Sequence, residues 1–468
     1  MALEVVGFRL YAPYFGYSIY VWGSMISVVM LALAAGYGLG GRLADRSGTS
    51  RPLYGVILAS AFYQLAVVFA ARSVLRAVST WGDFDGVVAA TLLVFAPPMA
   101  ALAGVGPYLV RLLARSGRVG STAGMVYAVS TAGSMAGTLG ASFYLLPHFG
   151  TQATLEILCA ATALMGVAGL VGRRRWTVVV LAPFVALGAA PPVVWSSDTI
   201  WTGESAYNLI RVVRQGSRVE LLLNSRNSIH TIRDEASAWT GFYYDDFALG
   251  PLLAPSRRVL VLGMGGGGSV RATRCTAPGA SIDAVEIDAK VVEAADRFFG
   301  VRGDANLHIH VADARPWLAR SRDRYSLVHV DLYHGGPYIP FYLSTVEFFT
   351  LVRSHTTEDG LLMMNVFDPG ANGDVLASMV ATIRQAYPSV MVLPAGFAGN
   401  RIVLAFAREE TLASVRQRLA AMEGTDMWHV LARKSAGEIE EPAVRADATV
   451  FTDDRAPIEA MTRRMLRE

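Results

Sequence analysis

The feature that most constrains this chain is a succession of long apolar runs between residues 14 and 195. A helix needs about 20 mostly apolar residues to cross a bilayer, and runs of this kind occur at 15–40, 54–72, 87–110, 123–147, 152–172 and 177–195. Hydrophobic residues make up 53% of the chain and charged residues only 17%, a balance too apolar for a purely soluble enzyme. We therefore predict a multi-pass transmembrane domain of about six spans over residues 1–198, placed in the cell membrane with the lipid bilayer as a partner.

The arginines of this half indicate how the spans are oriented. Clusters of them follow the first, third and fifth apolar runs, at residues 42–51, 111–118 and 173–175. The positive-inside rule places these clusters in the cytoplasm. If 177–195 also crosses, the residues after it lie outside, whereas a cytoplasmic metabolite as ligand favours the cytoplasm. The prolines of this last run leave room for a re-entrant segment, so the side of the membrane that holds the soluble part stays open.

Beyond residue 198 the composition is that of an ordinary soluble protein. Short apolar stretches separated by turn residues predict a small β-strand subdomain over 199–250. A Rossmann-like nucleoside-binding domain is expected over 251–410, followed by a C-terminal extension of helices and loops over 411–468. The expected fold class is thus a multi-pass α-helical membrane domain fused to an α/β Rossmann-like domain with a small N-terminal β subdomain.

The most informative motif of the soluble part is a glycine cluster between a predicted strand and a predicted helix. The apolar run 259–262 leads directly into the glycine-rich segment 263–268, and a second predicted strand ends in Glu286 about 20 residues later. Glycines let the backbone come close to a ligand, and a carboxylate at the second strand end can accept hydrogen bonds from both ribose hydroxyls. This layout predicts a nucleoside site.

Two further predicted strands also end in carboxylates. Asp313 and Ala314 follow the run that ends at Val311, and Asp331 follows the run 327–330. Ligands of open α/β sheets bind at the carboxyl ends of the strands, so Glu286, Asp313 and Asp331 are expected to surround one crevice. Asp313 is placed where its carboxylate could accept a hydrogen bond from an adenine amino group. Taken singly, each acid has the simpler interpretation of a helix cap or a solvated loop residue.

Together these motifs resemble the spermidine synthase (polyamine aminopropyltransferase) family, and the whole chain is similar to bacterial proteins that fuse a multi-pass membrane region to such a domain. The resemblance is carried by residues 204–208, 222–225 with His230, 263–268, 285–288, 312–314, 331–349 and 452–459. It implies a transferase of polyamine biosynthesis whose substrate is a sulfonium nucleoside, either decarboxylated S-adenosylmethionine or S-adenosylmethionine itself. Asp331 would be the general base that takes a proton from the attacking amine.

The resemblance also implies which residues contact the substrates. The nucleoside would be bound by Gly263, Gly265, Gly266, Gly267, Glu286, Asp313 and Ala314. The acceptor would meet Tyr207, His230, Tyr333, His334 and Tyr338. A lone histidine such as His334 more often makes a loop hydrogen bond than takes part in catalysis. Asp453 and Asp454 would either restore acidity at the mouth of the site or serve in a turn or helix cap.

The chain departs from the family pattern at three places. Gly266 stands where the family has an aspartate that faces the aminopropyl ammonium. His334 replaces the second acid of an Asp-x-x-Asp segment, and Asn224 replaces the aspartate of a Leu-Asp-Gly element. All three changes remove negative charge from positions where cationic amines would bind. A donor that bears a carboxylate, such as S-adenosylmethionine, would be repelled less than in the family.

Three functions therefore remain in competition. The first is a membrane-bound transferase that alkylates an amine or related nucleophile. The second is another S-adenosylmethionine reaction, such as methyl transfer, lyase chemistry or cyclisation, on a lipophilic substrate. The third is a non-catalytic membrane protein that senses a nucleoside or polyamine. The net charge of +3 gives no support to nucleic-acid binding, the two cysteines form no metal-spaced set, and the oligomeric state is open, with a homodimer as one alternative.

Overall fold

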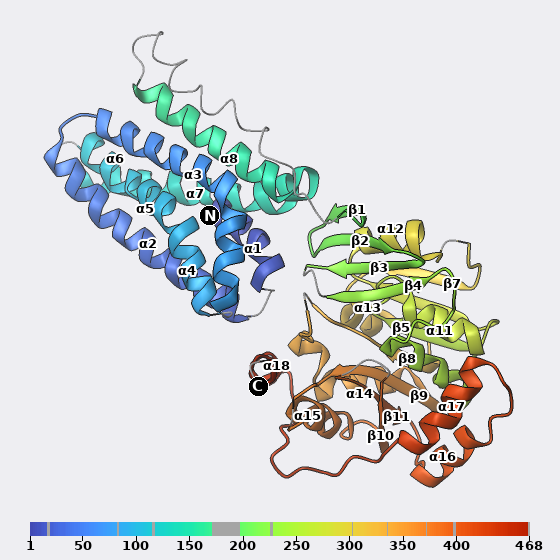
Figure 1. The fold of residues 1–468 in the computed structure, drawn as a ribbon. Helices are drawn as coiled ribbons and strands as arrows, with labels where there is room; N and C mark the ends of the chain where they lie inside the picture. The colour runs from blue at the N-terminus through green and yellow to red at the C-terminus, as the bar shows by residue number, and fades with distance from the viewer. Residues whose placement is uncertain are drawn as a thin grey trace. The chain divides into compact units, whose positions relative to one another are not determined.

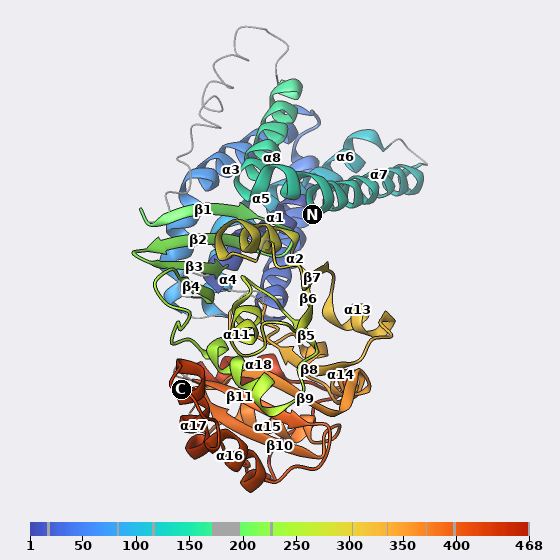
Figure 2. The same cartoon turned by 90° about the vertical axis from the view of Figure 1, so that its right-hand side faces the viewer.

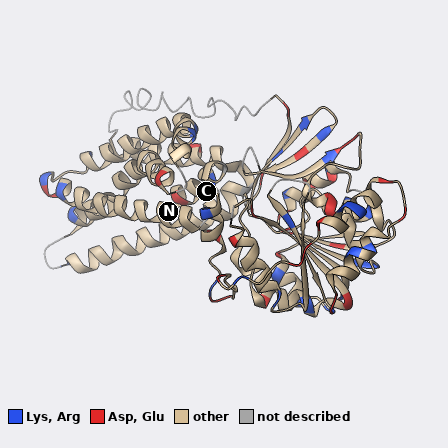
Figure 3. Cartoon of the chain, turned by 60° about the horizontal axis from the view of Figure 1, so that its bottom comes forward, with Lys and Arg blue, Asp and Glu red and all other residues tan. Residues whose placement is uncertain are grey.

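The structure is a computed structural model that describes residues 1–15, 19–81, 84–114, 118–170, 197–224, 228–301, 303–334, 336–370, 372–395 and 399–466. The chain divides into two compact units (Figure 1). The first comprises Met1–Trp195 with Glu204–Ala206, and the second comprises Ser196–Gly203 with Tyr207–Glu468. Figure 3 shows that charged residues are sparse along most helices of the first unit and frequent in the second.

The first unit is built of helices. They are α1 (Ala2–Phe15), α2 (Ile19–Arg46), α3 (Arg51–Val78), the 3-10 helix η1 (Ser79–Trp81), α4 (Asp85–Val94), α5 (Ala96–Ala103), α6 (Val105–Leu113), α7 (Val119–Gly140), the π-helix η2 (Ala141–Leu145) and α8 (Leu146–Leu170). Glycines let α2 pack closely on α5 and α6: a Cβ atom at Gly40 would lie only 2.3 Å from the Cα atom of Gly104. Small residues at such crossings are typical of helices that associate in lipid.

Three described helices are long and apolar enough to cross a membrane, namely Ile19–Arg46, Arg51–Trp81 and His148–Leu170. A bent pair, Asp85–Val94 with Ala96–Leu113, would raise the number to four. Helix α7 does not join this set, because glycine, serine and threonine make up much of it and lower its hydropathy. The run 177–195 lies outside the described residues, so the expectation of about six spans stays a prediction.

The sequence predicts one span at 87–110, but the structure has separate helices there, bent relative to each other. Helix α4 ends at Val94 and α5 begins at Ala96, and the two parts of the pair are bent by 51°. Pro97 and Pro98 follow at the start of α5. Proline has no backbone N–H and its ring clashes with the preceding turn, so a helix cannot continue regularly through it.

The second unit begins with a four-stranded sheet. Its strands are β1 (Thr199–Glu204), β2 (Leu209–Gln215), β3 (Arg218–Leu223) and β4 (Ile229–Asp234), in the order β1-β2-β3-β4. Strands β2, β3 and β4 pair antiparallel. The turn between β2 and β3 contains Gly216 with a φ of 62°, a left-handed conformation that glycine adopts without strain. The 3-10 helix η4 (Tyr243–Leu249) and the short helix α10 (Gly250–Leu253) then lead into the main sheet.

The main sheet has seven strands in the order β10-β11-β9-β8-β5-β6-β7. The strands are β5 (Arg258–Leu262), β6 (Ser281–Glu286), β7 (Leu307–Val311), β8 (Tyr325–Val330), β9 (Thr356–Phe367), β10 (Ser389–Pro394) and β11 (Asn400–Phe406). Strands β5 to β9 run parallel, and β11 runs antiparallel to both β9 and β10. The order reverses between β5 and β8, which is the place where an open α/β sheet binds its ligand. The predicted Rossmann-like α/β fold is confirmed.

Helices cover both faces of this sheet. They are α11 (Gly268–Thr276), α12 (Ala289–Ala294) continued by the π-helix η5 (Ala295–Phe299), α13 (Ala314–Arg320), the 3-10 helix η6 (Phe341–Leu343), α14 (Val346–Ser354), α15 (Asp374–Ile383), α16 (Leu412–Ala420), α17 (Met427–Glu438) and α18 (Ile458–Met465). Figure 2 shows α11 and α17 on one side and α13 and α14 on the other. The strands alternate accordingly: Val259 and Val261 pack into one apolar core, Leu260 and Leu262 into the other.

Candidate functional site

The glycine-rich segment forms a tight loop between β5 and α11. Gly263, Gly265 and Gly267 have φ values of 86°, 52° and 83°, which lie in the left-handed region that favours glycine. Gly263 also touches the neighbouring strand end, because a Cβ atom there would lie 2.1 Å from the carbonyl oxygen of Asp331. The loop is therefore pressed against the end of β8 at the point where the strand order reverses.

Glu286 lies at the carboxyl end of β6 and faces this loop. Its Oε2 atom accepts a hydrogen bond from the backbone N–H of Gly265 at 3.0 Å, and its Oε1 atom accepts one from the N–H of Asp288 at 3.1 Å. Burial raises the pKa of Glu286 to about 7, and the backbone donors oppose that shift. Each carboxylate oxygen can accept a further hydrogen bond, so the group remains able to bind a diol.

Asp313 follows β7 and caps the first turn of α13. Its Oδ1 atom accepts a hydrogen bond from the N–H of Arg315 at 3.1 Å, and its Oδ2 atom accepts one from the hydroxyl of Tyr342 at 2.8 Å. The guanidinium of Arg315 donates to the carbonyl of Tyr342 at 2.7 Å and forms an ion pair with Asp453. The Asp453 carboxylate also accepts from Thr345. The C-terminal segment thus ties the Tyr342 loop to Asp313, and Asp453 is engaged in that contact.

Asp331 follows β8 and is held by two side chains. The Tyr243 hydroxyl on η4 donates to its Oδ2 atom at 2.8 Å, and the Asn365 amide on β9 donates to its Oδ1 atom at 3.0 Å. Asn365 is itself fixed by Asn400, which donates to its amide oxygen at 2.7 Å. Burial raises the pKa of Asp331 to about 6, while both hydrogen bonds lower it. The carboxylate is oriented, and it titrates close to neutral pH.

One cleft, with about 890 Å³ of empty space including its open mouth, joins these strand ends. Of the residues predicted from the sequence, it is lined by Gly263, Gly265, Glu286, Asp313, Ala314, Asp331, His230, Tyr333 and His334. Gly266, Gly267, Tyr207 and Tyr338 do not line it. Gly266 and Gly267 shape the loop behind the cleft. Tyr207 is 38% exposed, and Tyr338 is buried and accepts a hydrogen bond from the N–H of His334 through its carbonyl.

Two of the residues predicted to contact the acceptor substrate use their polar atoms for other contacts. The Tyr333 hydroxyl donates to the carbonyl of Asn365 at 3.0 Å and accepts from the N–H of Phe367 at 2.9 Å, so it holds the backbone of β9. His230 Nε2 lies 2.9 Å from the hydroxyl of Ser228, and burial lowers the pKa of His230 to about 4. His230 is therefore a neutral residue of the cleft wall near pH 7.

Several residues of the site have no signal in the sequence that points to them. They are Tyr243 and Asn365, which bind Asp331, and the cleft residues Thr231 and Tyr244. Asn365 carries the one hint, a polar residue inside the apolar run 361–366. Tyr243, Thr231 and Tyr244 come from segments whose approach to the cleft depends on the order of the strands. Asn208, Ser269 and Tyr342 also line the cleft, and they lie within or directly after segments that carry the family resemblance.

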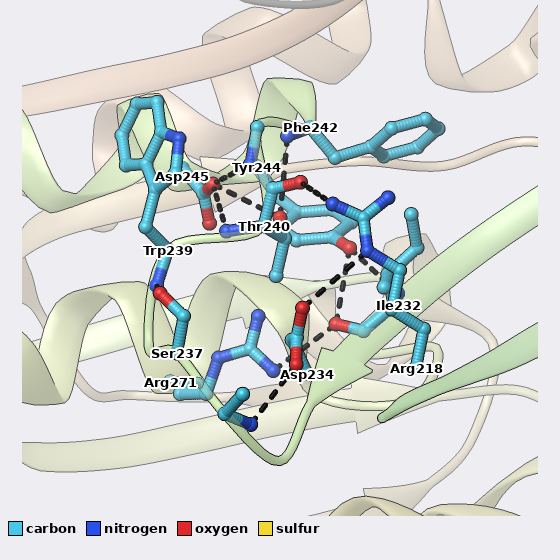
Figure 4. Close-up of polar contacts among 12 residues, drawn as sticks. Arg218, Ile232, Asp234, Ser237, Trp239, Thr240, Phe242, Tyr244, Asp245 and Arg271 are labelled. Carbon is cyan, nitrogen blue, oxygen red and sulfur yellow. Dashed lines mark hydrogen bonds and ion pairs between the residues drawn. The ribbon is translucent and has the colours of Figure 1, made fainter. Parts of the chain in front are cut away.

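The wall formed by β4 is fixed by the polar contacts of Figure 4. The Tyr244 hydroxyl accepts a hydrogen bond from the N–H of Ile232 at 2.6 Å and donates to its carbonyl at 3.1 Å, and Arg271 donates to the same carbonyl at 3.0 Å. Asp245 accepts from the N–H and hydroxyl of Thr240 and anchors the segment between β4 and η4. Position 231, next to Ile232, is therefore held in place against the glycine loop.

A seven-stranded α/β sheet with a glycine loop and carboxylates at its strand ends is the arrangement on which Rossmann-like folds bind nucleosides. Residues 248–407 match the family model described as "Spermine/spermidine synthase domain". The chain therefore carries a spermine/spermidine synthase domain over these residues, and two curated relatives that it resembles are named as aminopropyl transferases.

Two curated relatives and one solved structure illustrate the similarity. A "Probable polyamine aminopropyl transferase" of Bifidobacterium longum is 29% identical over 310 residues, which cover 62% of this chain and 69% of that protein. A "Polyamine aminopropyltransferase" of Vibrio vulnificus is 33% identical over 113 residues, covering 24% and 38%. The solved structure, titled as a probable spermidine synthase from Corynebacterium glutamicum, is 18% identical with a TM-score of 0.43, and the match covers 56% of this chain and 97% of that one.

Proposed function

We propose that this protein is a membrane-bound alkyltransferase that binds a sulfonium nucleoside, decarboxylated S-adenosylmethionine or S-adenosylmethionine, and alkylates an amine or related nucleophile. The observation that carries the proposal is that Glu286, Asp313 and Asp331 line one cleft at the carboxyl ends of β6, β7 and β8. The curated relatives that are named polyamine aminopropyltransferases support the same reaction class.

The nucleoside would lie across the ends of β6 and β7. Glu286 would accept hydrogen bonds from the two ribose hydroxyls, which suits a carboxylate whose oxygens are already oriented by Gly265 and Asp288. Asp313 would accept a hydrogen bond from the adenine amino group, with its carboxylate held in place by Tyr342. A donor bound this way carries its sulfur toward the loop at Gly263, which touches Asp331.

The chemistry requires a base near the attacking nitrogen. The nitrogen lone pair forms a bond to the carbon next to the sulfonium, the carbon–sulfur bond breaks, and its electron pair returns to sulfur as a neutral thioether. The nitrogen then carries an extra proton, which Asp331 would accept. With its pKa raised to about 6 by burial, the Asp331 carboxylate is mostly ionised at pH 7 and basic enough to take the proton.

The helical unit would anchor the enzyme in the membrane. Its three long apolar helices support this part of the proposal. In lipid such helices satisfy their own backbone hydrogen bonds, which makes them suitable spans. An acceptor that partitions into the bilayer would then reach the enzyme at high local concentration, so both polar amines and lipophilic amines belong in a substrate screen.

The proposal is tested by substituting the base. Asp331→Asn keeps the size of the side chain and removes its basicity, so kcat for transfer to an amine should fall by about 100-fold or more, while affinity for the nucleoside stays within about threefold. The matched control is Asp359→Asn, an exposed residue of β9. Full activity of Asp331→Asn would contradict the assignment of the base.

A second candidate is a different S-adenosylmethionine reaction, such as methyl transfer. It is favoured by a contact that leaves no room at Gly266 for the aspartate that would face an aminopropyl ammonium. The backbone N–H of Gly266 donates to the Thr231 hydroxyl at 2.9 Å, and the Thr231 side chain fills the space in front of Gly266. A product analysis distinguishes the candidates, because transfer of a methyl group and transfer of an aminopropyl group leave different thioether nucleosides.

A further inference from the structure

The wall of the cleft between β4 and α11 differs in charge from the rest of it. Thr231, Tyr244 and Ser269 line this wall, and none of them is ionisable near neutral pH. The carboxylates that line the cleft are Glu286, Asp313 and Asp331, all at the strand ends. His230 on β4 is neutral because burial lowers its pKa to about 4.

Thr231 also prevents a carboxylate from being added to this wall at the loop. A Cβ atom built on Gly266 would lie 2.9 Å from both the Cβ and the Cγ2 atoms of Thr231, and 3.1 Å from the ring of Phe299. Contacts below about 3 Å force a neighbour to move, and Thr231 is fixed by its hydrogen bond to Gly266 and by the anchored Ile232 beside it. No acidic side chain can stand at position 266 without a second change at 231.

Ser269 supplies a hydrogen-bond donor on the same wall. It lies in the first turn of α11, is only 5% exposed and lines the cleft. Its hydroxyl makes no hydrogen bond within the part of the chain that the structure describes. The first N–H groups of a helix lack intrahelical partners, and the helix dipole favours an anion at this end. A buried hydroxyl and a helix N-terminus therefore face the cleft together.

We propose that this wall receives the tail carboxylate of the donor, so that the enzyme binds S-adenosylmethionine in preference to its decarboxylated form. The inference rests on the proposed function, since it needs the nucleoside at Glu286 and Asp313. A nucleoside held there would place its sulfur toward Gly263, which touches Asp331, and a substituent of the sulfur could then follow the glycine loop to Ser269, which lines the same cleft. That substituent would meet a hydroxyl donor and a helix N-terminus, which suit the carboxylate that only S-adenosylmethionine carries. The ammonium is common to both donors and has no carboxylate partner on this wall, so the tail of the decarboxylated form would find no favourable partner there.

The test is calorimetric titration of the full-length protein in detergent with three ligands: S-adenosylmethionine, its decarboxylated form, and methylthioadenosine, which has no charged tail. S-adenosylmethionine should bind about tenfold more tightly than the decarboxylated form, as expected for one charge-assisted hydrogen bond. Ser269→Ala should weaken S-adenosylmethionine by about tenfold and leave methylthioadenosine unchanged. Ser354→Ala, on the exposed surface of α14, is the matched control.

A double substitution tests the role of Thr231 by gain of function. Thr231→Gly frees the space, and Gly266→Asp then adds a carboxylate to the wall, so the pair should shift the preference toward the decarboxylated donor by about tenfold. Thr231→Gly alone adds no carboxylate to the wall, so S-adenosylmethionine should remain the tighter ligand. A wild-type preference for the decarboxylated form, or an unchanged affinity of Ser269→Ala for S-adenosylmethionine, would overturn the inference. Failure of methylthioadenosine to bind would instead contradict the proposed function.

Discussion

The hydroxyl of Tyr243 donates a hydrogen bond to the Oδ2 atom of Asp331 at 2.8 Å. The contact joins η4 to the end of β8, two segments far apart in the sequence, and it places a neutral donor on the carboxylate that would act as the base. Burial raises the pKa of the Tyr243 phenol well above its ordinary value, so the donor keeps its proton at all relevant pH values.

Removal of this hydrogen bond should change the pH profile of the enzyme. The bond lowers the pKa of Asp331, which burial raises to about 6. The active form is the ionised one, so activity should rise with pH through about 6, and Tyr243→Phe should shift this limb to higher pH. A shift of about one pH unit would lower kcat at pH 7 by about twofold, and kcat should recover at pH 8.5. Tyr127→Phe, exposed on α7, serves as the control, and an unshifted limb would argue against Asp331 as the base.

Glu286 should make the unliganded protein less stable as the pH rises. Its pKa is about 7 in the folded chain, above the ordinary value of 4.5. The folded state therefore favours the protonated form, and this stabilisation is complete below pH 4.5 and is lost as the pH rises through 7. Glu286→Gln should raise the melting temperature at pH 8 by about 5 °C and flatten its dependence on pH, as measured by thermal unfolding between pH 5 and 8. An equal slope in both proteins would contradict the raised pKa.

The ion pair between Arg315 and Asp453 should affect nucleoside binding more than stability. Asp453 is partly exposed, and exposed ion pairs stabilise by only about 0.2–1 kcal/mol. Arg315 also holds the carbonyl of Tyr342, whose hydroxyl orients Asp313. Arg315→Ala should therefore raise the KM for the nucleoside by about fivefold, with kcat nearly unchanged. A loss confined to kcat would show that this contact does not act through the adenine end of the cleft.

Close packing in the helical unit gives a matched pair of substitutions. A Cβ atom at Gly40 would lie 2.3 Å from Gly104, whereas one at Gly38 has no atom within 4 Å. Gly40→Val should separate α2 from α5 and α6 and cost about 2 kcal/mol or more of stability, while Gly38→Val should be nearly neutral. Thermal unfolding in detergent measures both, and equal effects of the two substitutions would contradict this packing.

The parts of the site that the sequence predicts are those encoded by local order along the chain. A strand, a glycine loop, a helix and a strand-end acid follow one another within about 30 residues of a βαβ unit, and Glu286 does line the cleft with Asp313 and Asp331. Tyr243, Asn365 and Thr231 lie in segments that meet these acids only after the strands are ordered, with β8 between β5 and β9. The sequence around each of these three residues does not indicate that it lies near the strand-end acids.

The helical unit also contains a feature that the local sequence does not predict. Long apolar runs predict the helices α2 and α3, because hydropathy is sufficient to identify them. The run 87–110 has the same composition, yet Pro97 and Pro98 break it into helices bent by 51°. Hydropathy is averaged over a window and does not depend on whether a backbone N–H is present. It therefore does not predict the break between α4 and α5.

Binding of a sulfonium nucleoside in the cleft through Glu286 is measured by titrating methylthioadenosine into full-length protein at pH 8 and comparing Glu286→Gln. The control is Glu409→Gln, an exposed residue of the same unit. The wild type and the control should bind measurably, and Glu286→Gln should bind at least about tenfold more weakly, because a charge-assisted acceptor for the ribose is lost. Equal binding by all three proteins, or none by any of them, would contradict nucleoside binding through Glu286.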